Sequence, residues 1–357
     1  MMRHLFVLVP SLHPTGPVKG AVALVNALAD RREVTLVYLK PGPGVDAPLD
    51  RRVGVVSLAQ EGSLGRKLAR YKNILLNAGG RERVASLSFC YSADMVNMFC
   101  RRQAVIGSSV RGNLLVIYRM DYGVPAIPLA MLHLSALRAF DHVVAMTGAM
   151  AEQVRFYSSR QPTVIGNFVD EEPLESYRRM LPNKGPLRYV FLGSLTPRKR
   201  PMVLLHAISE LVREEVDVHL DIIGEGPMRK QMEVEIARLG LGESVVLHGH
   251  LPVPFDLVAQ ADALVLPSSS EGVSRGSLEA LHLGVPCVLR DIDGNDELVQ
   301  PGENGILFKL EEELASAMRK VAVWSRGRDG ARGSLLPPTF RQSAAAQRYM
   351  DLMESRA

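Results

Sequence analysis

The chain has 357 residues, of which 47% are apolar and 22% are charged. This length is sufficient for two ordinary α/β domains, and the high apolar and low charged fractions exclude an intrinsically disordered chain. The cysteines Cys90, Cys100 and Cys287 have neither C-x-x-C nor metal-ligand spacing, so free thiols in a reducing compartment are expected. The first apolar run is interrupted by Pro10 and is too short for a signal peptide or a membrane-spanning helix.

The net charge of +4 is unevenly distributed. Residues 1–170 contain 20 Lys and Arg against 11 Asp and Glu, whereas the remainder contains 22 against 27. A basic half of this kind suits nucleic acid, an anionic membrane or a phosphorylated substrate. Since no arginine-aromatic interleaving and no helix-turn-helix pattern accompany the charge, nucleic acid is not an expected partner.

In the first half, short apolar runs alternate with helical segments. The glycine- and proline-containing stretch 13–20 is expected to form a loop between the first strand and the first helix. The alternation predicts βαβ units around a parallel sheet. Strands are expected at 4–12, 33–39, 54–58, 85–89, 114–121 and 142–148, and helices at 21–31 and 64–76.

The second half repeats this pattern, which predicts a second doubly wound domain. Acidic and turn residues break the pattern between Asn167 and Pro186, so the domains are placed at 1–170 and 171–340. A last helix, 341–357, follows two prolines and is expected to cross back to the N-terminal domain. Strands are expected at 187–195, 218–224, 244–249, 261–267 and 286–290, a turn at 304–308, and helices at 201–214, 227–240 and 276–284.

Ligands of open parallel sheets bind outside the carboxyl ends of the strands. The loop Gly193–Pro201 follows an expected strand and opens a helix. It concentrates Arg198, Lys199 and Arg200 beside the positive end of that helix, which is the outline of an anion site. A solvated basic loop is the alternative interpretation.

A second loop of this kind contains Glu271, and Glu279 follows eight positions later. Ser274 is a good N-cap, so Glu271 is expected in the loop and Glu279 in the second helical turn. The backbone N–H groups of Arg275, Gly276 and Ser277 are then available to an anion. The two carboxylates should lie roughly 10 Å apart, which disfavours a retaining glycosidase pair and favours contacts with two parts of one ligand.

The run from Glu271 to Phe308 resembles the donor-binding signature of the retaining GT-B glycosyltransferases often called family 4. Asn167–Asp170 resembles the interdomain motif of that family, and Gly193–Pro201 resembles its phosphate loop. The resemblance extends over most of the chain and is strongest over residues 189–308. It implies the GT-B fold, in which two Rossmann-like domains face a central cleft, with the acceptor on the N-terminal domain and the donor on the C-terminal domain.

The resemblance also implies residue roles. Glu279 is expected to accept hydrogen bonds from the ribose of a nucleotide-diphosphate sugar, and Glu271 to hold the hydroxyls of the donor sugar. Lys199 corresponds to the lysine that neutralises the diphosphate leaving group, and Gly249 and His250 should lie near the base. The other donor-binding residues implied in this domain are Gly193, Ser194, Arg198, Gly272, Val273, Ser274, Arg275 and Gly276.

Departures from the family pattern concern the cations and the first glycine loop. Ser194 stands where the family usually has arginine. At the end of the strand expected at 114–121, where many members carry a catalytic histidine, Arg119 is the candidate residue. Gly16 and Gly20 replace the usual paired glycines of the first loop and are expected to face the donor phosphates or the acceptor.

No metal and no other cofactor is expected, since lysine and a helix N-terminus can stabilise the departing diphosphate. Asp291 and Asp293 form a D-x-D sequence, but it matches an ordinary loop of the family. His248 and His250 lack a third ligand.

The expected function is therefore transfer of a sugar, with UDP as the default nucleotide, to a glycan or lipid-diphosphate-linked acceptor in bacterial cell-surface polysaccharide synthesis. The expected location is the cytoplasm, at the inner face of the plasma membrane. The segment Leu64–Arg83 predicts a basic amphipathic helix that contacts either the sheet alone or also an anionic membrane. The alternatives are a GT-B nucleotide-sugar epimerase and a non-catalytic nucleotide-sugar-binding protein.

Overall fold

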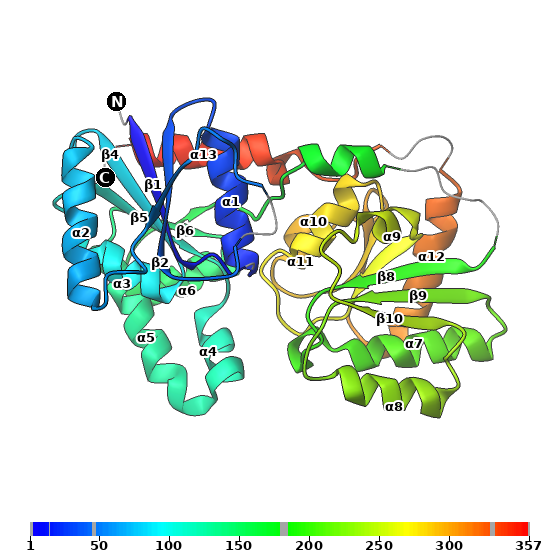
Figure 1. Cartoon of the computed structure of the whole chain (residues 1–357). Coiled ribbons are helices and arrows are strands. Elements are labelled where there is room, and N and C mark those ends of the chain that lie inside the picture. The colour runs from blue at the N-terminus through cyan, green and yellow to red at the C-terminus, as the bar shows by residue number, and fades with distance from the viewer. Residues whose placement is uncertain (1–2, 14, 45–47, 179–184, 329–332, 356–357) are drawn as a thin grey trace. The chain divides into compact units, whose positions relative to one another are not determined.

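The computed structural model describes residues 3–13, 15–44, 48–178, 185–328 and 333–355 (Figure 1). The chain divides into two compact units. Unit 1 comprises Met1–Asp170 together with Thr339–Ala357, and unit 2 comprises Glu171–Pro338. The first boundary coincides with the predicted one, and the second lies two residues before the predicted end of the C-terminal domain.

Unit 1 is built on a seven-stranded parallel sheet with the order β3-β2-β1-β4-β5-β6-β7 in the described part of the chain. Val7 of β1 is in register with Leu36 of β2 and Leu87 of β4. The order reverses direction between β1 and β4, which is the switch point where such sheets bind ligands. The strands are β1 (His4–Ser11), β2 (Glu33–Lys40), β3 (Gly54–Ser57), β4 (Val84–Phe89), β5 (Val105–Val110), β6 (His142–Ala145) and β7 (Thr163–Val164).

Helices cover both faces of this sheet because alternate residues of β1 enter different cores. Leu5, Val7 and Val9 lie in one apolar cluster, whereas Phe6 and Leu8 lie in the other. The first cluster includes α1 and α13, and the second includes α2, α3, α4 and α5. The helices are α1 (Gly16–Leu28), α2 (Leu64–Asn77), α3 (Tyr91–Asn97), α4 (Leu114–Tyr122), α5 (Ile127–Ala136), α6 (Gly148–Ser158) and α13 (Gln342–Glu354).

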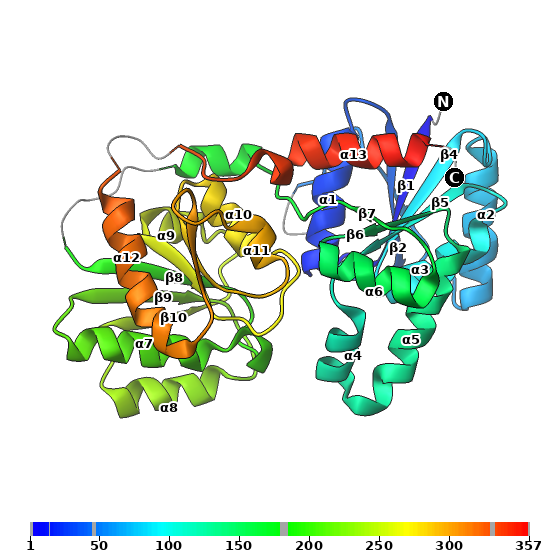
Figure 2. The same ribbon diagram turned by 180° about the vertical axis from the view of Figure 1, so that it is seen from behind.

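Helix α13 lies beside α1 in unit 1 (Figures 1 and 2). Its apolar side chains Ala345, Ala346 and Met353 are buried in the same cluster as α1. The Tyr349 hydroxyl forms a hydrogen bond of 2.9 Å with Ser109 Oγ. The predicted return of the last helix to the N-terminal domain is therefore confirmed.

Two elements of unit 1 differ from the sequence prediction. Residues 114–121, predicted as a strand, belong to helix α4, because Asn113 caps it by accepting a hydrogen bond from Val116 N (3.1 Å) and Gly123, with φ of 80°, ends it. A short apolar run does not by itself distinguish strand from helix. The true strand, β5, precedes this run. The expected glycine loop is also wrong from Gly16 onward, since α1 begins there with proline in its first turn.

Unit 2 contains a six-stranded parallel sheet with the order β10-β9-β8-β11-β12-β13 among the described residues. All of the predicted strands are present, and residues 305–308, predicted as part of a turn, form a further strand. The strands are β8 (Leu187–Leu192), β9 (Val218–Ile223), β10 (Val245–Gly249), β11 (Ala263–Leu266), β12 (Cys287–Arg290) and β13 (Gly305–Phe308). The helices are α7 (Pro201–Arg213), α8 (Arg229–Leu239), α9 (Phe255–Gln260), α10 (Arg275–His282), α11 (Asn295–Leu298) and α12 (Leu314–Arg326).

Across the described ranges, no helix combines the length and the apolar character that crossing a bilayer requires.

Candidate functional site

The loops after β8, β9 and β10 in unit 2 pack against one another through glycines. Gly193 N donates to Ile223 O (3.0 Å), and Gly224 N donates to Gly249 O (2.8 Å). A Cβ atom on Gly224 would lie 1.8 Å from Gly193 O, and one on Gly226 would lie 2.4 Å from Leu195 O. The glycines after β9 are therefore required by loop packing, which aligns the carboxyl ends of the three strands.

Lys199 and Arg198 meet Glu271 at the carboxyl edge of this sheet. The short 3-10 helix Pro197–Lys199 follows β8, and Glu271 follows β11, the neighbour of β8. Lys199 Nζ lies 2.6 Å from Glu271 Oε1, and Arg198 NH1 lies 3.2 Å from Glu271 Oε2. The side chains of Lys199 and Glu271 are each only 8% exposed. We name these three residues the charge cluster.

The loop that carries Glu271 is also fixed by backbone contacts. Arg198 NH1 donates to Ser270 O (2.7 Å), and Arg198 O accepts from Ser269 N (2.8 Å). Two loops distant in sequence are thus held together by both main-chain and side-chain bonds.

Burial would raise the pKa of Glu271, but the charges of Lys199 and Arg198, with hydrogen bonds from Lys199 and Ser268, outweigh burial and hold the pKa below its ordinary value. Glu271 is therefore ionised at neutral pH. An ionised carboxylate accepts hydrogen bonds but donates none, which suits contact with sugar hydroxyls.

Helix α10 begins where the sequence predicted, with Ser274 as its N-cap. Glu271 lies before the helix, and Glu279 lies in its second turn, where Arg275 NH2 is 3.8 Å from Glu279 Oε1. Ser274 Oγ accepts a hydrogen bond from Ser277 N (3.4 Å), so that N–H group, which the sequence assigned to an anion, is used by the cap.

The N-terminus of α10 approaches the end of β8 closely. A Cβ atom on Gly276 would lie 3.1 Å from Leu192 O. At the other end of α10, the fully buried ring of His282 has Nε2 3.1 Å from Glu175 Oε1 and lies 3.3 Å from Arg178 NH2. Both ends of the helix that carries Glu279 are therefore fixed within unit 2.

The predicted base-binding residues Gly249 and His250 lie at the end of β10. Gly249 has φ of 74°, and a Cβ atom there would lie 2.8 Å from Glu225 Oε1. His248 is occupied structurally, since its Nε2 lies 2.6 Å from Asp221 Oδ1. Within the described ranges, no group of three or more His, Cys, Asp or Glu side chains is arranged to hold a metal ion.

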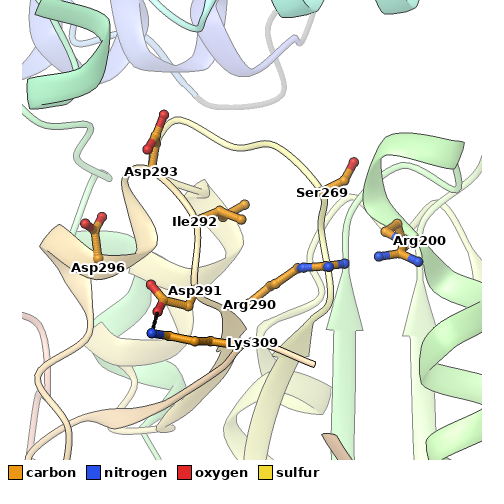
Figure 3. Close-up of a pocket in the computed structure, with 8 residues that line it drawn as sticks. All are labelled: Arg200, Ser269, Arg290, Asp291, Ile292, Asp293, Asp296 and Lys309. Atoms are coloured by element: carbon orange, nitrogen blue, oxygen red, sulfur yellow. Dashed lines mark ion pairs between the residues drawn. The ribbon is translucent and has the colours of Figure 1, made fainter. Parts of the chain in front are cut away.

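A pocket of about 580 Å³ lies beside the charge cluster, at the ends of β12 and β13. Figure 3 shows the Arg290 side chain pointing toward Arg200, while Asp291 and Asp293 point in different directions. Asp291 Oδ2 pairs with Lys309 Nζ at 3.5 Å. The D-x-D aspartates therefore do not converge on one point. The pocket is lined by Arg200, Ser269, Arg290, Asp291, Ile292, Asp293, Asp296 and Lys309.

In unit 1, Arg119 does not lie where the sequence placed it. It is an exposed residue in the last turn of α4 and not the end of a strand. The residue that follows the true strand, β5, is Arg111. Its guanidinium lies 5.2 Å from the centre of the Phe89 ring, and its NH2 donates to Asn167 Oδ1 (3.1 Å). Sequence analysis missed Arg111.

The Arg111 guanidinium has one further feature. Its NH1 is buried and has no hydrogen-bond partner in the part of the chain that the structure describes. A buried donor of this kind requires an explanation such as a water or an anion. The signal in the sequence was Arg111 followed by Gly112, directly after residues 105–110. Because that run contains a glycine and two serines, its apolar character was too low for it to be predicted as a strand.

The two N-terminal glycines have different surroundings. A Cβ atom on Gly20 would lie 2.2 Å from Arg111 NH2, whereas one on Gly16 would meet no atom within 4 Å. Gly20 therefore makes room for the guanidinium. The expectation that Gly16 and Gly20 lie in a loop is wrong, since both belong to α1, whereas their expected position facing the donor phosphates or the acceptor stays a prediction.

The segment Leu64–Arg83 forms α2 and the turn after it. Tyr71 and Leu75 are buried in the core. Lys67 Nζ donates to Leu39 O (2.7 Å), and Arg70 pairs with Glu61 at 2.6 Å. These contacts support the interpretation of α2 as a helix packed on the sheet with a solvated face.

Comparison with known proteins relates one part of the chain to a described family. Residues 186–322, which include the charge cluster and Glu279, match the family described as glycosyl transferases group 1. The lipopolysaccharide core biosynthesis glycosyltransferase LpsE of Rhizobium meliloti is 25% identical over 94% of this chain and 94% of its own length. The alpha-D-kanosaminyltransferase of Streptomyces kanamyceticus is 28% identical over 37% of this chain and 35% of its own length.

Among solved structures, Anabaena Alr3699/HepE in complex with UDP and glucose superposes with a TM-score of 0.74 at 19% identity, covering 98% of both chains. Likeness of this kind confirms the predicted GT-B fold class of two Rossmann-like domains. The alignments with three curated relatives span only 34% to 39% of their lengths.

Proposed function

We propose that this chain is a retaining, metal-independent glycosyltransferase that moves a sugar from a nucleotide-diphosphate sugar to a glycan or lipid-diphosphate-linked acceptor. The observation that carries the proposal is the charge cluster. It lies within the segment that matches the group 1 family, at the sheet edge where doubly wound folds bind ligands.

The charge cluster suits a donor with a negative diphosphate and a neutral sugar. Lys199 and Arg198 are held together by one carboxylate, so the cluster carries an excess of positive charge. A diphosphate that replaces Glu271 as the partner of Lys199 would use this excess. Glu271 would then accept hydrogen bonds from the sugar hydroxyls, and Glu279 from the ribose.

In the proposed reaction, the bond between the anomeric carbon and the diphosphate oxygen breaks, and the acceptor oxygen bonds to that carbon on the same face. The proton of the acceptor hydroxyl passes to the departing phosphate. Lys199 stabilises the charge that develops on the diphosphate, and this requires neither a protein nucleophile nor a metal.

In unit 1 we assign Arg111, in place of Arg119, as the cation at the carboxyl edge of the sheet. Its guanidinium presents paired N–H groups of the kind that bind phosphate. A diphosphate in the acceptor is the corresponding ligand.

UDP is the nucleotide that we propose, a choice supported by the UDP in the HepE complex. The name of LpsE supports a role in bacterial cell-surface polysaccharide synthesis. We place the protein in the cytoplasm, at the inner face of the plasma membrane, where a lipid-linked acceptor would be available.

A panel of UDP-, GDP- and ADP-sugars in a thermal-shift assay tests the donor, since a ligand that binds only the folded chain raises its melting temperature. We expect UDP-sugars to raise it in the absence of divalent metal, and no shift with any nucleotide sugar would contradict the proposal. Product analysis then separates the classes. Transfer with release of UDP supports the transferase, whereas conversion of the sugar to its epimer supports an epimerase, and binding without turnover supports a non-catalytic protein.

A further inference from the structure

The segment that joins β5 to β6 in unit 1 exposes an unusual amount of apolar surface. Residues 122–137 contain no Asp, Glu, Lys or Arg. They begin with Tyr122, the last residue of α4, and include the 3-10 turn Val124–Ala126 and all of α5. We name the side chains concerned the apolar tip. They are Tyr122 (72% exposed), Val124 (61%), Leu129 (41%), Met131 (41%) and Leu132 (60%).

Helices α4 and α5 form a hairpin that extends away from the sheet of unit 1 (Figures 1 and 2). The base of the hairpin is firmly held. Tyr118 OH lies 3.2 Å from His133 Nδ1, and His133 Nε2 lies 2.8 Å from Asp94 Oδ2. Ala130 and Leu134 are fully buried on the inner side of α5. The exposure of the apolar tip therefore belongs to an ordered hairpin and does not arise from fraying.

Helix α5 departs from the usual pattern of surface helices, which present polar residues to solvent. Its inner side is apolar because it packs on the core, yet Leu129, Met131 and Leu132 on its outer side are apolar as well. Helix α2 of the same unit shows the usual pattern, with Leu64 and Leu76 as its exposed large apolar residues among many charges. Contiguous exposed apolar surface on one element indicates an interaction site.

The charges around the apolar tip indicate the kind of partner. The exposed cations nearest to the uncharged run in the sequence are Arg119 and Arg138, and the acidic residue Asp121 directly precedes the run. The surrounding part of the chain, residues 1–170, has 20 basic against 11 acidic residues. Exposed apolar side chains on a part of the chain with a net positive charge complement a surface with anionic headgroups above an apolar layer.

We propose that the hairpin Leu114–Ala136 docks on an anionic lipid surface, with the apolar tip at the boundary between headgroups and acyl chains. Arg119 and Arg138 contact the headgroups. This replaces α2 as the membrane-contacting element, since Tyr71 and Leu75 of α2 are buried in the core of unit 1. The inference does not depend on the proposed sugar transfer, because lipid binding can be measured without turnover.

Co-sedimentation with vesicles of phosphatidylcholine, with and without phosphatidylglycerol, tests the proposal on the full chain. We expect binding to the anionic vesicles. The double variant Leu129→Asp/Leu132→Asp should reduce the vesicle affinity by about tenfold or more, since it puts charge into the apolar layer. The matched control Leu64→Asp/Leu76→Asp on α2 should bind as the wild type does. Unfolding temperatures of both variants establish that each chain is folded.

A second measurement reports the environment of the tip directly. Trp324 is the sole tryptophan, so Trp324→Phe provides a background without tryptophan fluorescence. In that background, Leu132→Trp should show an emission shift to shorter wavelength when anionic vesicles are added, and Leu76→Trp should not. A shift at position 76 without one at position 132 would return the membrane contact to α2 and overturn the proposal.

A second copy of the chain is the competing occupant of the apolar tip. Sedimentation velocity measures whether the wild type forms a dimer. The lipid proposal would be overturned if the wild type formed a dimer that disappears in Leu129→Asp/Leu132→Asp and did not bind vesicles.

The contribution of Arg119 is tested separately. Arg119→Gln should weaken binding to anionic vesicles by about fivefold and leave binding to neutral vesicles unchanged.

Discussion

The carboxyl edges of the two sheets present charge in different ways. In unit 2, Lys199 and Arg198 share the carboxylate of Glu271, so opposite charges already satisfy one another. In unit 1, the Arg111 guanidinium rests on Phe89 and bonds Asn167, but its NH1 has no partner among the described residues.

If both sites bind anions as we propose, this difference predicts two modes of binding. A ligand of the charge cluster must exchange partners with Glu271, so its binding energy is the difference between two strong interactions. A ligand of Arg111 adds a partner to a donor that lacks one, and the geometry of the guanidinium is fixed beforehand by the packing around it. The first site should respond to changes of charge, and the second to changes of shape.

The largest expected effect is that of Lys199→Met. It removes the cation beside a nearly buried carboxylate and beside the proposed leaving group. We expect sugar transfer to fall by about 10²- to 10³-fold and the free energy of unfolding to fall by up to about 3 kcal/mol. Steady-state kinetics and urea unfolding measure the two quantities. Arg238→Gln, at an exposed pair with Glu235, is the control and should change neither. Normal transfer by Lys199→Met would remove the charge cluster from the proposed mechanism.

Glu279→Gln should weaken donor binding by about tenfold or more, since a hydrogen bond to a charged acceptor is worth about 1.5–3 kcal/mol. Calorimetric titration with the UDP-sugar found in the thermal-shift panel measures the loss. If the glutamate contacts the ribose, 2′-deoxyuridine and 3′-deoxyuridine analogues of the donor should lose less affinity in the variant than in the wild type. Equal losses in both proteins would place Glu279 elsewhere.

Gly20→Ala tests whether shape governs the site in unit 1. The new Cβ atom would lie 2.2 Å from Arg111 NH2, so the guanidinium must move. We expect transfer to fall by about tenfold, as it does when positioning is disturbed. Gly16→Ala is the matched control, since nothing lies within 4 Å of a Cβ atom there.

A double-mutant cycle sharpens this test. In an Arg111→Gln background, Gly20→Ala should have little further effect, because the two changes act through one group. Additive losses would show that Gly20 acts independently of Arg111.

The pH dependence of stability reports the pairing of Glu271. Its pKa is lowered in the folded chain, so its contribution to stability is full above the pKa of the unfolded chain and disappears as the pH falls through the lower folded value. The stability difference between the wild type and Glu271→Gln should therefore shrink as the pH falls from 7 to 3. In a Lys199→Met background, the stability difference caused by Glu271→Gln should be smaller at neutral pH. Burial of Glu271 then opposes ionisation of its carboxyl group, and only Arg198 remains in the charge cluster to stabilise the charged form. Chemical denaturation over the pH series measures both differences.

The smallest expected effect is that of Ser194→Arg, which restores the arginine that related phosphate loops usually carry. Ser194 is exposed, so a longer side chain meets no packing barrier. A gain in donor affinity of about threefold is expected for one partly solvated cation. Ser194→Gln adds length without charge and should give no gain.

Unit 2 was the more predictable of the two. Most of its strands are predominantly apolar runs, and the positions of Ser274 and Glu279 follow from ordinary capping rules. In unit 1 the strand β5 contains glycine and two serines, whereas the helix α4 after it begins with four apolar residues. Hydrophobicity therefore assigned the strand to the wrong segment, and Arg119 was chosen in place of Arg111.

The ion pairing of Glu271 could not be predicted for a different reason. Sequence spacing placed Lys199 and Glu271 in separate loops, but their contact depends on the adjacency of β8 and β11, a long-range property of the sheet order. The role of Gly20 likewise depends on Arg111, far away in the sequence. Local patterns locate the elements, and only the tertiary arrangement shows which side chains meet.

Helix α13 has a consequence for the order in which the chain can fold. Unit 1 is discontinuous, because Ala345, Ala346, Tyr349 and Met353 complete a core begun by α1. During synthesis, these side chains leave the ribosome only after all of unit 2 has done so. Unit 2 can therefore close its core first, while the apolar side chains of α1 that pack against α13 stay uncovered in the nascent chain.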